Sequence, residues 1–205
     1  MKDTVIVFAR APRLGAVKRR LARDIGDRAA LRFHVATMTR LVRALVAERR
    51  FQTVVALTPD RARLSLRVKQ MPQGSGDLGA RMHRAFRRHR KGRVAIIGCD
   101  IPAAGPVDLR TAFRALGRAD AVFGPATDGG YWLVAMGVRR PARPFARVRW
   151  SSEHALIDTL VNFAGRRVAR LRSLTDVDTV DDWRWHHASL DGKSRSRHGA
   201  CPSGE

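Results

Sequence analysis

Short apolar runs alternate with longer amphipathic stretches along most of this chain. The runs at 4–9, 53–58 and 93–98 are almost continuously apolar, which is typical of strands that helices cover on both faces. Weaker runs that we also predict to be strands lie at 66–71, 120–125, 131–137 and 167–172.

The stretches between these runs carry apolar residues at helical spacing. In the clearest one, 28–48, a single stripe is predicted to face the core: Leu31, Val35, Met38, Leu41, Val42 and Leu45. Ser151 is the expected N-cap of another helix, which ends at Gly165. Further helices are predicted at 17–25, 77–89, 106–117 and 179–190. The alternation predicts an α/β fold, a single-domain three-layer sandwich around a mostly parallel central sheet.

The end of the chain differs in composition from the rest. From Asp191 onward there is almost nothing to bury, so we predict one domain over 1–188 and a disordered basic tail over 189–205. We expect a cytoplasmic protein, because the first apolar run is too short for a signal peptide and no stretch approaches transmembrane length. Two cysteines, Cys99 and Cys201, make no disulfide framework, and Cys99 is expected to be a small buried residue.

The formal net charge of +22 comes from 40 basic and 18 acidic residues, and only five of the basic residues are lysines. A balance this basic is typical of proteins that bind nucleic acid or an anionic surface. The arginines are scattered along the whole chain, however, which favours a solvated basic background. A non-catalytic nucleic-acid-binding protein remains an alternative function.

Candidate chemistry lies in loops that follow the predicted strands, where ligands bind in open α/β sheets. The loop 10–20 ends in Gly15 and places Lys18, Arg19 and Arg20 in the first turn of a helix. Cations there oppose the helix dipole, and a bound phosphate would compensate for them. The alternative is a solvated basic stretch.

Asp100 follows the strand at 93–98 and precedes Pro102 by two positions. A carboxylate opposite a phosphate-binding loop is suited to Mg²⁺ or Mn²⁺, which prefer oxygen ligands and bridge phosphate oxygens. The alternative is that Asp100 caps the following turn.

Six segments occur in an order that resembles the bacterial DUF2064 family, whose members are also called rSAM/selenodomain-associated transferase 1. They are FARAPRLGAVKRRL, GSGDLGARM, IGCDIP, GPATDGGYWLVAM, RWSSEHAL and LTDVDTVDDW. The resemblance covers about residues 4 to 185 and implies a fold of the GT-A, nucleotide-diphospho-sugar transferase type. It also implies a glycosyltransferase of the kind found in arsenosugar-type gene clusters.

The resemblance implies a role for each matching residue. The first loop would wrap the nucleotide, Lys18 and Arg20 would contact its phosphates, and the G-D-L-G segment would lie near the base or ribose. The nucleotide-binding residues would be Phe8, Ala9, Arg10, Gly15, Lys18, Arg20, Gly76, Asp77 and Gly79.

The acidic motifs would hold the metal and the second substrate. Asp100 and Asp178 would bind the divalent cation, Mg²⁺ or Mn²⁺. Asp128, Gly129 and Gly130 would lie on the acceptor or donor-sugar side, and Asp128 and Lys18 would be catalytic. The chain departs from the family pattern at Arg19, Arg149 and Val180, and Arg19 puts the chemistry of the first loop in question.

Other polar and aromatic residues are expected to be structural. Trp183 and Trp185, with His186 and His187, would dock a terminal helix. His34, His83 and His89 are expected on helical surfaces, without the spacing of metal ligands.

The function predicted from these motifs is metal-dependent transfer from a nucleotide-activated donor. Glycosyl transfer from a nucleoside-diphosphate sugar to a small-molecule acceptor is preferred on the family resemblance. The alternative is nucleotidyl transfer from a nucleoside triphosphate to a small phosphorylated acceptor, with release of pyrophosphate. The expected partners are the donor and the acceptor, without a specific nucleic acid or a membrane.

Overall fold

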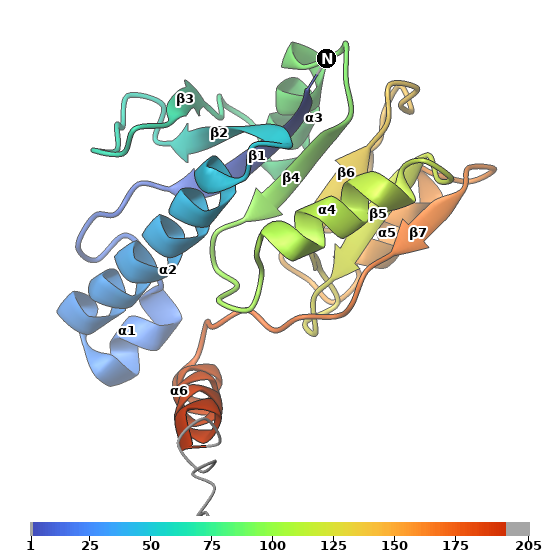
Figure 1. Ribbon diagram of the computed structural model, residues 1–205. Helices are drawn as coiled ribbons and strands as arrows, with labels where there is room; N and C mark the ends of the chain where they lie inside the picture. The colour runs from blue at the N-terminus through green and yellow to red at the C-terminus, as the bar shows by residue number, and fades with distance from the viewer. Residues whose placement is uncertain (1, 196–205) are drawn as a thin grey trace, which may run out of the picture.

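Seven strands form one sheet in the computed structural model, which describes residues 2–195 (Figure 1). The strand order is β3-β2-β1-β4-β6-β5-β7. β6 runs antiparallel to both of its neighbours, β4 and β5, and the other pairs are parallel. The bounds are β1 Asp3–Arg10, β2 Phe51–Thr58, β3 Lys69–Pro72, β4 Val94–Gly98, β5 Ala121–Pro125, β6 Tyr131–Met136 and β7 Val168–Arg170.

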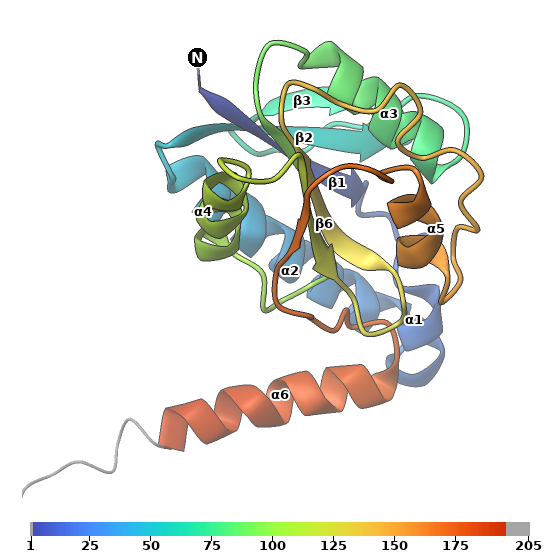
Figure 2. The ribbon, with the colours of Figure 1, turned by 90° about the vertical axis from the view of Figure 1, so that its right-hand side faces the viewer.

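Helices cover both faces of this sheet, which confirms the three-layer α/β fold (Figure 2). α2 and α4 pack on one face, and α3 and α5 pack on the other. The bounds are α1 Arg19–Ile25, α2 Asp27–Ala47, α3 Leu78–Arg88, α4 Pro106–Ala115, α5 Ala155–Val161 and α6 Val180–Arg195.

β1 shows why the apolar runs are continuous. Successive side chains of a strand point to opposite faces, so Val5 and Val7 join the core under α2 and α4. Ile6 between them joins the core under α3 and α5. All three side chains are fully buried, because β1 lies in the middle of the sheet between β2 and β4.

Two predicted helix starts are wrong. α1 begins at Arg19, and the preceding Lys18 has a left-handed backbone with φ of 48°. α5 begins at Ala155, so Ser151 is not its N-cap. The cause is tertiary: the residues before α5 dock on the β5–β6 loop, where the Leu156 amide donates to the Gly129 carbonyl at 3.0 Å.

The stripe predicted on α2 is buried at Met38, Leu41, Val42 and Leu45, but Val35 is 38% exposed. The neighbouring His34 is buried instead, so the buried stripe at this turn of α2 runs through His34 and not through Val35. Cys99 is buried, as predicted.

α6 runs past residue 188, so the predicted end of the domain falls inside a helix. Val180 and Trp183 pack against a small cluster around Leu21, whereas Trp185 is 68% exposed. Docking therefore involves the beginning of the helix, and α6 then extends away from the sandwich (Figure 2). The side chains of His187 and of residues 189–195, and the whole of residues 196–205, lie outside the described part, so the disordered tail stays a prediction. Among the described residues, no helix has the length and apolar character to cross a membrane.

Candidate functional site

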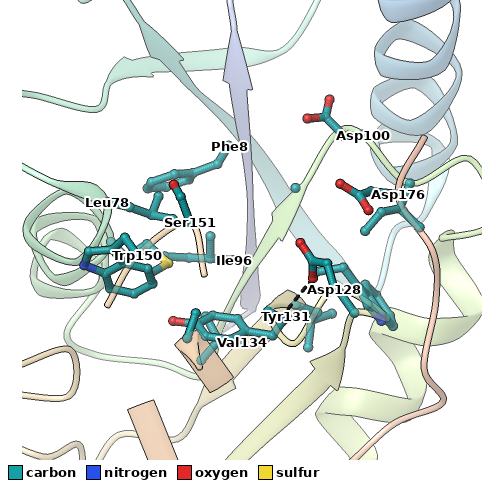
Figure 3. Close-up of a pocket in the computed structure, with 18 of the residues that line it drawn as sticks. Phe8, Leu78, Ile96, Asp100, Asp128, Tyr131, Val134, Trp150, Ser151 and Asp176 are labelled. Carbon is teal, nitrogen blue, oxygen red and sulfur yellow. Dashed lines mark hydrogen bonds between the residues drawn. The ribbon is translucent and has the colours of Figure 1, made fainter. Parts of the chain in front are cut away.

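The loops after β1, β4 and β5 and the segment after β7 meet at one edge of the sheet, beside a pocket of about 400 Å³ (Figure 3). Carboxylates gather at one end of the pocket and aromatic rings at the other. The lining residues are Phe8, Leu78, Met82, Ile96, Gly98, Asp100, Ile101, Ala126, Asp128, Gly130, Tyr131, Trp132, Leu133, Val134, Trp150, Ser151, Ser152, Ala155 and Asp176.

The acidic end takes its side chains from three separate segments. Asp100 follows β4, Asp128 lies between β5 and β6, and Asp176 follows β7. The Val177 amide donates to the Asp100 carbonyl at 3.4 Å, which brings the last segment beside the β4 loop. Burial raises the pKa of Asp176 to about 6, and the charges of Asp178 and Asp128 add to this effect.

Asp176 was missed by the sequence analysis. The sequence signal that could have identified Asp176 is its position two residues before Asp178. When the apolar residue between two acids is buried, both acids can point to the same site. Val177 is 3% exposed and packs against Leu21, so it anchors the segment that presents both carboxylates.

Lys18 lies between two of these acids. Its ammonium is 2.8 Å from Asp178 Oδ1 and 3.4 Å from Asp100 Oδ2, and its side chain is 3% exposed. Burial opposes the charged form, but Asp100 and Asp178 outweigh it and raise the pKa of Lys18. The structure thus brings Lys18 together with the two predicted metal ligands, Asp100 and Asp178. Both ion pairs of Lys18 are made with these carboxylates.

Asp128 and Gly130 of the D-G-G segment line the pocket. Gly129 has φ of 84°, and a Cβ there would overlap the Glu153 carbonyl oxygen, so only glycine fits. The Gly130 amide donates to Asp128 Oδ1 at 2.9 Å, which orients the Asp128 carboxylate.

The other end of the pocket is apolar, with Phe8 and Leu78 facing Tyr131 and Trp150. The Tyr131 hydroxyl accepts a hydrogen bond from Thr159 Oγ1 at 3.4 Å, and burial raises the pKa of Tyr131. The hydroxyl is therefore engaged within the protein, and the ring remains for ligand contact.

Trp150 is held in place by its neighbours on both sides. Arg149 donates two side-chain hydrogen bonds of 2.9 Å to the Asp158 carboxylate on α5. On α3, a Cβ at Gly79 would approach Trp150 to 2.8 Å. Gly79 thus permits close packing of Trp150, which is a structural role that the sequence analysis did not foresee.

The remaining predicted nucleotide-binding residues lie outside the pocket lining. Ala9 is buried, and Arg10, Gly15 and Arg20 are exposed. Gly76 and Asp77 precede α3, where Asp77 caps the helix by accepting from the Ala80 amide at 2.7 Å. Their contacts with a nucleotide stay a prediction.

His34 does not lie on a helical surface, so that prediction is wrong. Its side chain is 3% exposed, with Nε2 at 3.0 Å from the Arg10 carbonyl oxygen and Nδ1 at 3.7 Å from Asp100 Oδ1. α2 crosses beneath the loops that follow β1 and β4, and this packing buries His34. Spacing along one helix could not reveal a partner on another element.

Several comparisons relate the chain to known proteins. The family model described as "Uncharacterized protein conserved in bacteria (DUF2064)" matches residues 34–152. A search among curated proteins found no match. Among solved structures, a "putative nucleotide-diphospho-sugar transferase" from Desulfovibrio desulfuricans G20 is similar with a TM-score of 0.85 and 26% identity, over 92% of this chain and 88% of that chain.

Two more distant structures are similar in fold. A nucleotidyl transferase from Methanothermobacter has a TM-score of 0.64 and 16% identity, over 93% of this chain and 99% of that chain. A manganese complex of Rv0371c from Mycobacterium tuberculosis H37Rv has a TM-score of 0.53 and 18% identity, over 90% and 97% of the two chains.

Proposed function

This chain belongs to the DUF2064 family, and on that premise we propose that it is a metal-dependent transferase with a nucleotide-activated donor. The observation that carries the proposal is a cluster of acids: Asp100, Asp128 and Asp176 line one end of the pocket, and Lys18 joins Asp100 to Asp178. Four carboxylates in one place are costly in a metal-free protein, and a divalent cation would offset that cost.

Asp100 and Asp178 offer the carboxylate oxygens that Mg²⁺ and Mn²⁺ prefer, and Asp176 is a third candidate ligand. A cation bound there would contact the donor's phosphate oxygens and offset the charge that develops on the leaving group. Lys18 supplies a second positive charge beside the same carboxylates. Its ammonium would stabilise phosphate oxygens of the donor.

For glycosyl transfer, Asp128 would hold the acceptor hydroxyl and take its proton. The hydroxyl oxygen would bond to the anomeric carbon of the sugar while the bond from that carbon to the diphosphate breaks. The nucleoside diphosphate would leave toward Lys18. The apolar wall formed by Phe8, Tyr131 and Trp150 would exclude water and bind the flat or apolar part of a substrate.

Nucleotidyl transfer is the second candidate, because it needs the same phosphate and metal machinery. The similarity in fold to a nucleotidyl transferase from Methanothermobacter supports this second candidate. The greater similarity to the Desulfovibrio protein, described as a "putative nucleotide-diphospho-sugar transferase", supports glycosyl transfer as the first choice. A non-catalytic nucleic-acid role gains nothing from this pocket, since its acids would repel a phosphate backbone.

Calorimetry with UDP, CDP and GDP, each with and without Mn²⁺, tests the metal-linked nucleotide site. We expect Asp100→Asn and Asp178→Asn each to remove the Mn²⁺-dependent part of the affinity, because neutral amides hold the cation poorly. Asp24→Asn on α1 is the matched control and should bind like the wild type. Equal Mn²⁺-dependent binding by all four proteins would contradict the assignment.

The two reactions are separated by their leaving groups. Glycosyl transfer releases a nucleoside diphosphate from a nucleoside-diphosphate sugar, whereas nucleotidyl transfer releases pyrophosphate from a nucleoside triphosphate. We expect the wild-type protein to release the nucleoside diphosphate from a nucleoside-diphosphate sugar. We expect the variant Asp128→Asn to lose this activity. Pyrophosphate release that depends on a phosphorylated acceptor would assign the second function instead.

A further inference from the structure

We propose that His34, Cys99 and Asp100 form a second metal site, selective for a transition-metal ion such as Zn²⁺. Within residues 2–195 these side chains form a group whose imidazole, thiol and carboxylate ligand atoms all lie within 4.8 Å of one another. The proposal shares Asp100 with the proposed function but uses different partners of that residue.

The hydrogen bonding of His34 leaves a metal-binding nitrogen directed at Asp100. Nε2 is 3.0 Å from the Arg10 carbonyl oxygen, and a carbonyl can only accept, so Nε2 carries the hydrogen. In the neutral ring, Nδ1 then has a free lone pair and faces Asp100 Oδ1 at 3.7 Å. A backbone carbonyl that fixes the ring in this way is the usual outer partner of a metal-binding histidine.

Two of the three separations between ligand atoms are close to those around tetrahedral Zn²⁺. Cys99 Sγ lies 3.4 Å from Asp100 Oδ1, and His34 Nδ1 lies 3.7 Å from the same oxygen. Tetrahedral bonds of about 2.0–2.3 Å place neighbouring ligand atoms roughly 3.3–3.6 Å apart. A sulfur and an imidazole nitrogen also favour Zn²⁺ over Mg²⁺, which prefers oxygen.

The two oxygens of Asp100 serve different sides. Oδ1 faces His34 and Cys99, whereas Oδ2 faces Lys18, which in turn contacts Asp178. The transition-metal site is therefore on the opposite side of this carboxylate from the oxygen-rich site proposed for Mg²⁺ or Mn²⁺.

Access and protonation are compatible with such a site. His34 and Cys99 are each 3% exposed, but the Asp100 side chain is 46% exposed and lines the pocket, which gives an ion a path of entry. Metal coordination would release the thiol proton of Cys99 to solvent. Three protein ligands leave a fourth position open toward water or a substrate.

Co²⁺ is the probe, because it replaces Zn²⁺ and a thiolate bound to it gives a charge-transfer absorption band in the near ultraviolet. Titration of the tag-free, reduced, full-length protein under anaerobic conditions should give this band, with tetrahedral visible bands, at one equivalent of Co²⁺. Added Zn²⁺ should abolish the spectrum. Absence of the thiolate band in the wild type would overturn the proposal.

Variants identify the ligands and separate this site from the nucleotide site. Cys99→Ala should lose the thiolate band and keep Mn²⁺-dependent nucleotide binding, and His34→Gln should weaken Co²⁺ binding at least about tenfold. Cys201→Ser and His83→Gln are the matched controls and should retain the wild-type spectrum. Loss of the band in Cys201→Ser but not in Cys99→Ala would contradict the assignment.

Asp178→Asn distinguishes the two proposals. It should lose Mn²⁺-dependent nucleotide binding and retain the Co²⁺ spectrum, because Asp178 lies on the Oδ2 side of Asp100. Retention of nucleotide binding with loss of the Co²⁺ spectrum would count against both assignments. If nucleotides fail to bind even the wild-type protein while its Co²⁺ spectrum persists, only the proposed function fails.

Discussion

At the scale of single residues, Asp176 bears the clearest mark of a site that needs a cation. Its carboxylate is partly withdrawn from water and is repelled by the charges of Asp178 and Asp128, so its charged form is disfavoured. Lys18 offsets part of this cost, but its short contacts go to Asp178 and Asp100.

In the presence of a chelator, the charged Asp176 carboxylate should therefore lower the free energy of unfolding above about pH 4. The folded pKa, about 6, lies above the ordinary value of 3.8, so folding loses stability as pH rises between these values. Asp176→Asn should be more stable than the wild type at pH 7. We expect about 1–2 kcal/mol, less than the full shift implies, because the side chain is partly exposed.

Urea unfolding with EDTA, from pH 4 to pH 8, measures this difference. The advantage of Asp176→Asn should shrink as pH falls from 6 to 4, and saturating Mn²⁺ should reduce it at pH 7. Asp24→Asn, an exposed change on α1, should give no such pH-dependent gain. A variant that is less stable than the wild type at pH 7 in EDTA would disprove the prediction.

At the scale of elements, the site depends on how the β5–β6 loop meets the turn before α5. The Gly129 backbone packs directly on Glu153, and the Gly129 carbonyl accepts from Leu156 on α5. The hairpin loop that carries Asp128 is thereby fixed to the segment that carries Trp150.

Gly129→Ala should destabilise the protein more than Gly26→Ala, the matched control. Both glycines have φ above 80°, so each alanine should cost about 1–3 kcal/mol in backbone conformation. A Cβ at Gly26 meets open space, whereas one at Gly129 overlaps the Glu153 carbonyl and should add about 1–3 kcal/mol. Urea unfolding measures both, and equal losses would contradict the close packing.

The Arg149 to Asp158 ion pair should restrain the segment 147–154. Asp158→Asn should increase hydrogen exchange there and weaken donor binding, while Asp181→Asn, which removes another surface ion pair with arginine, should not. Arg149 lowers the pKa of Asp158, so the restraint should persist from neutral pH to about pH 4 and fail only in stronger acid. Failure between pH 6 and pH 5 would contradict the assignment.

At the scale of the whole molecule, acids are concentrated at the pocket within a strongly basic chain. Basic residues line a hollow at the other end of the sheet, near the start of β1 and the end of α3: Lys2, Arg87, Arg88, Arg90 and Lys91. Binding of polyanions and binding of nucleotides should therefore be separable.

Duplex DNA should bind weakly, without sequence preference, and its affinity should fall at least about 100-fold between about 50 and 200 mM salt through counterion release. Fluorescence anisotropy measures this, with Arg90→Glu lowering DNA affinity and leaving Mn²⁺-dependent nucleotide binding intact. A salt-resistant complex with one preferred sequence would promote the nucleic-acid function.

The sequence by itself determined the strands and the identity of the edge that carries the chemistry. Continuous apolar runs mark strands that are buried on both faces, as β1 and β4 are. Residues that directly follow such strands lie at the carboxyl edge of the sheet, whatever the order of the strands. Asp100 could be singled out for this reason.

Only the tertiary structure decided which side chains face one another. The charged form of Asp176 is disfavoured partly because the segment after β7 brings it near Asp128 of the β5–β6 loop. His34 approaches Asp100 because α2, which packs on β1 and β2, places it beside the loops that follow β1 and β4. Ser151 fails as a helix cap because its segment docks on Gly129. These contacts join residues distant in sequence, and local periodicity contains no information about their distances or their burial.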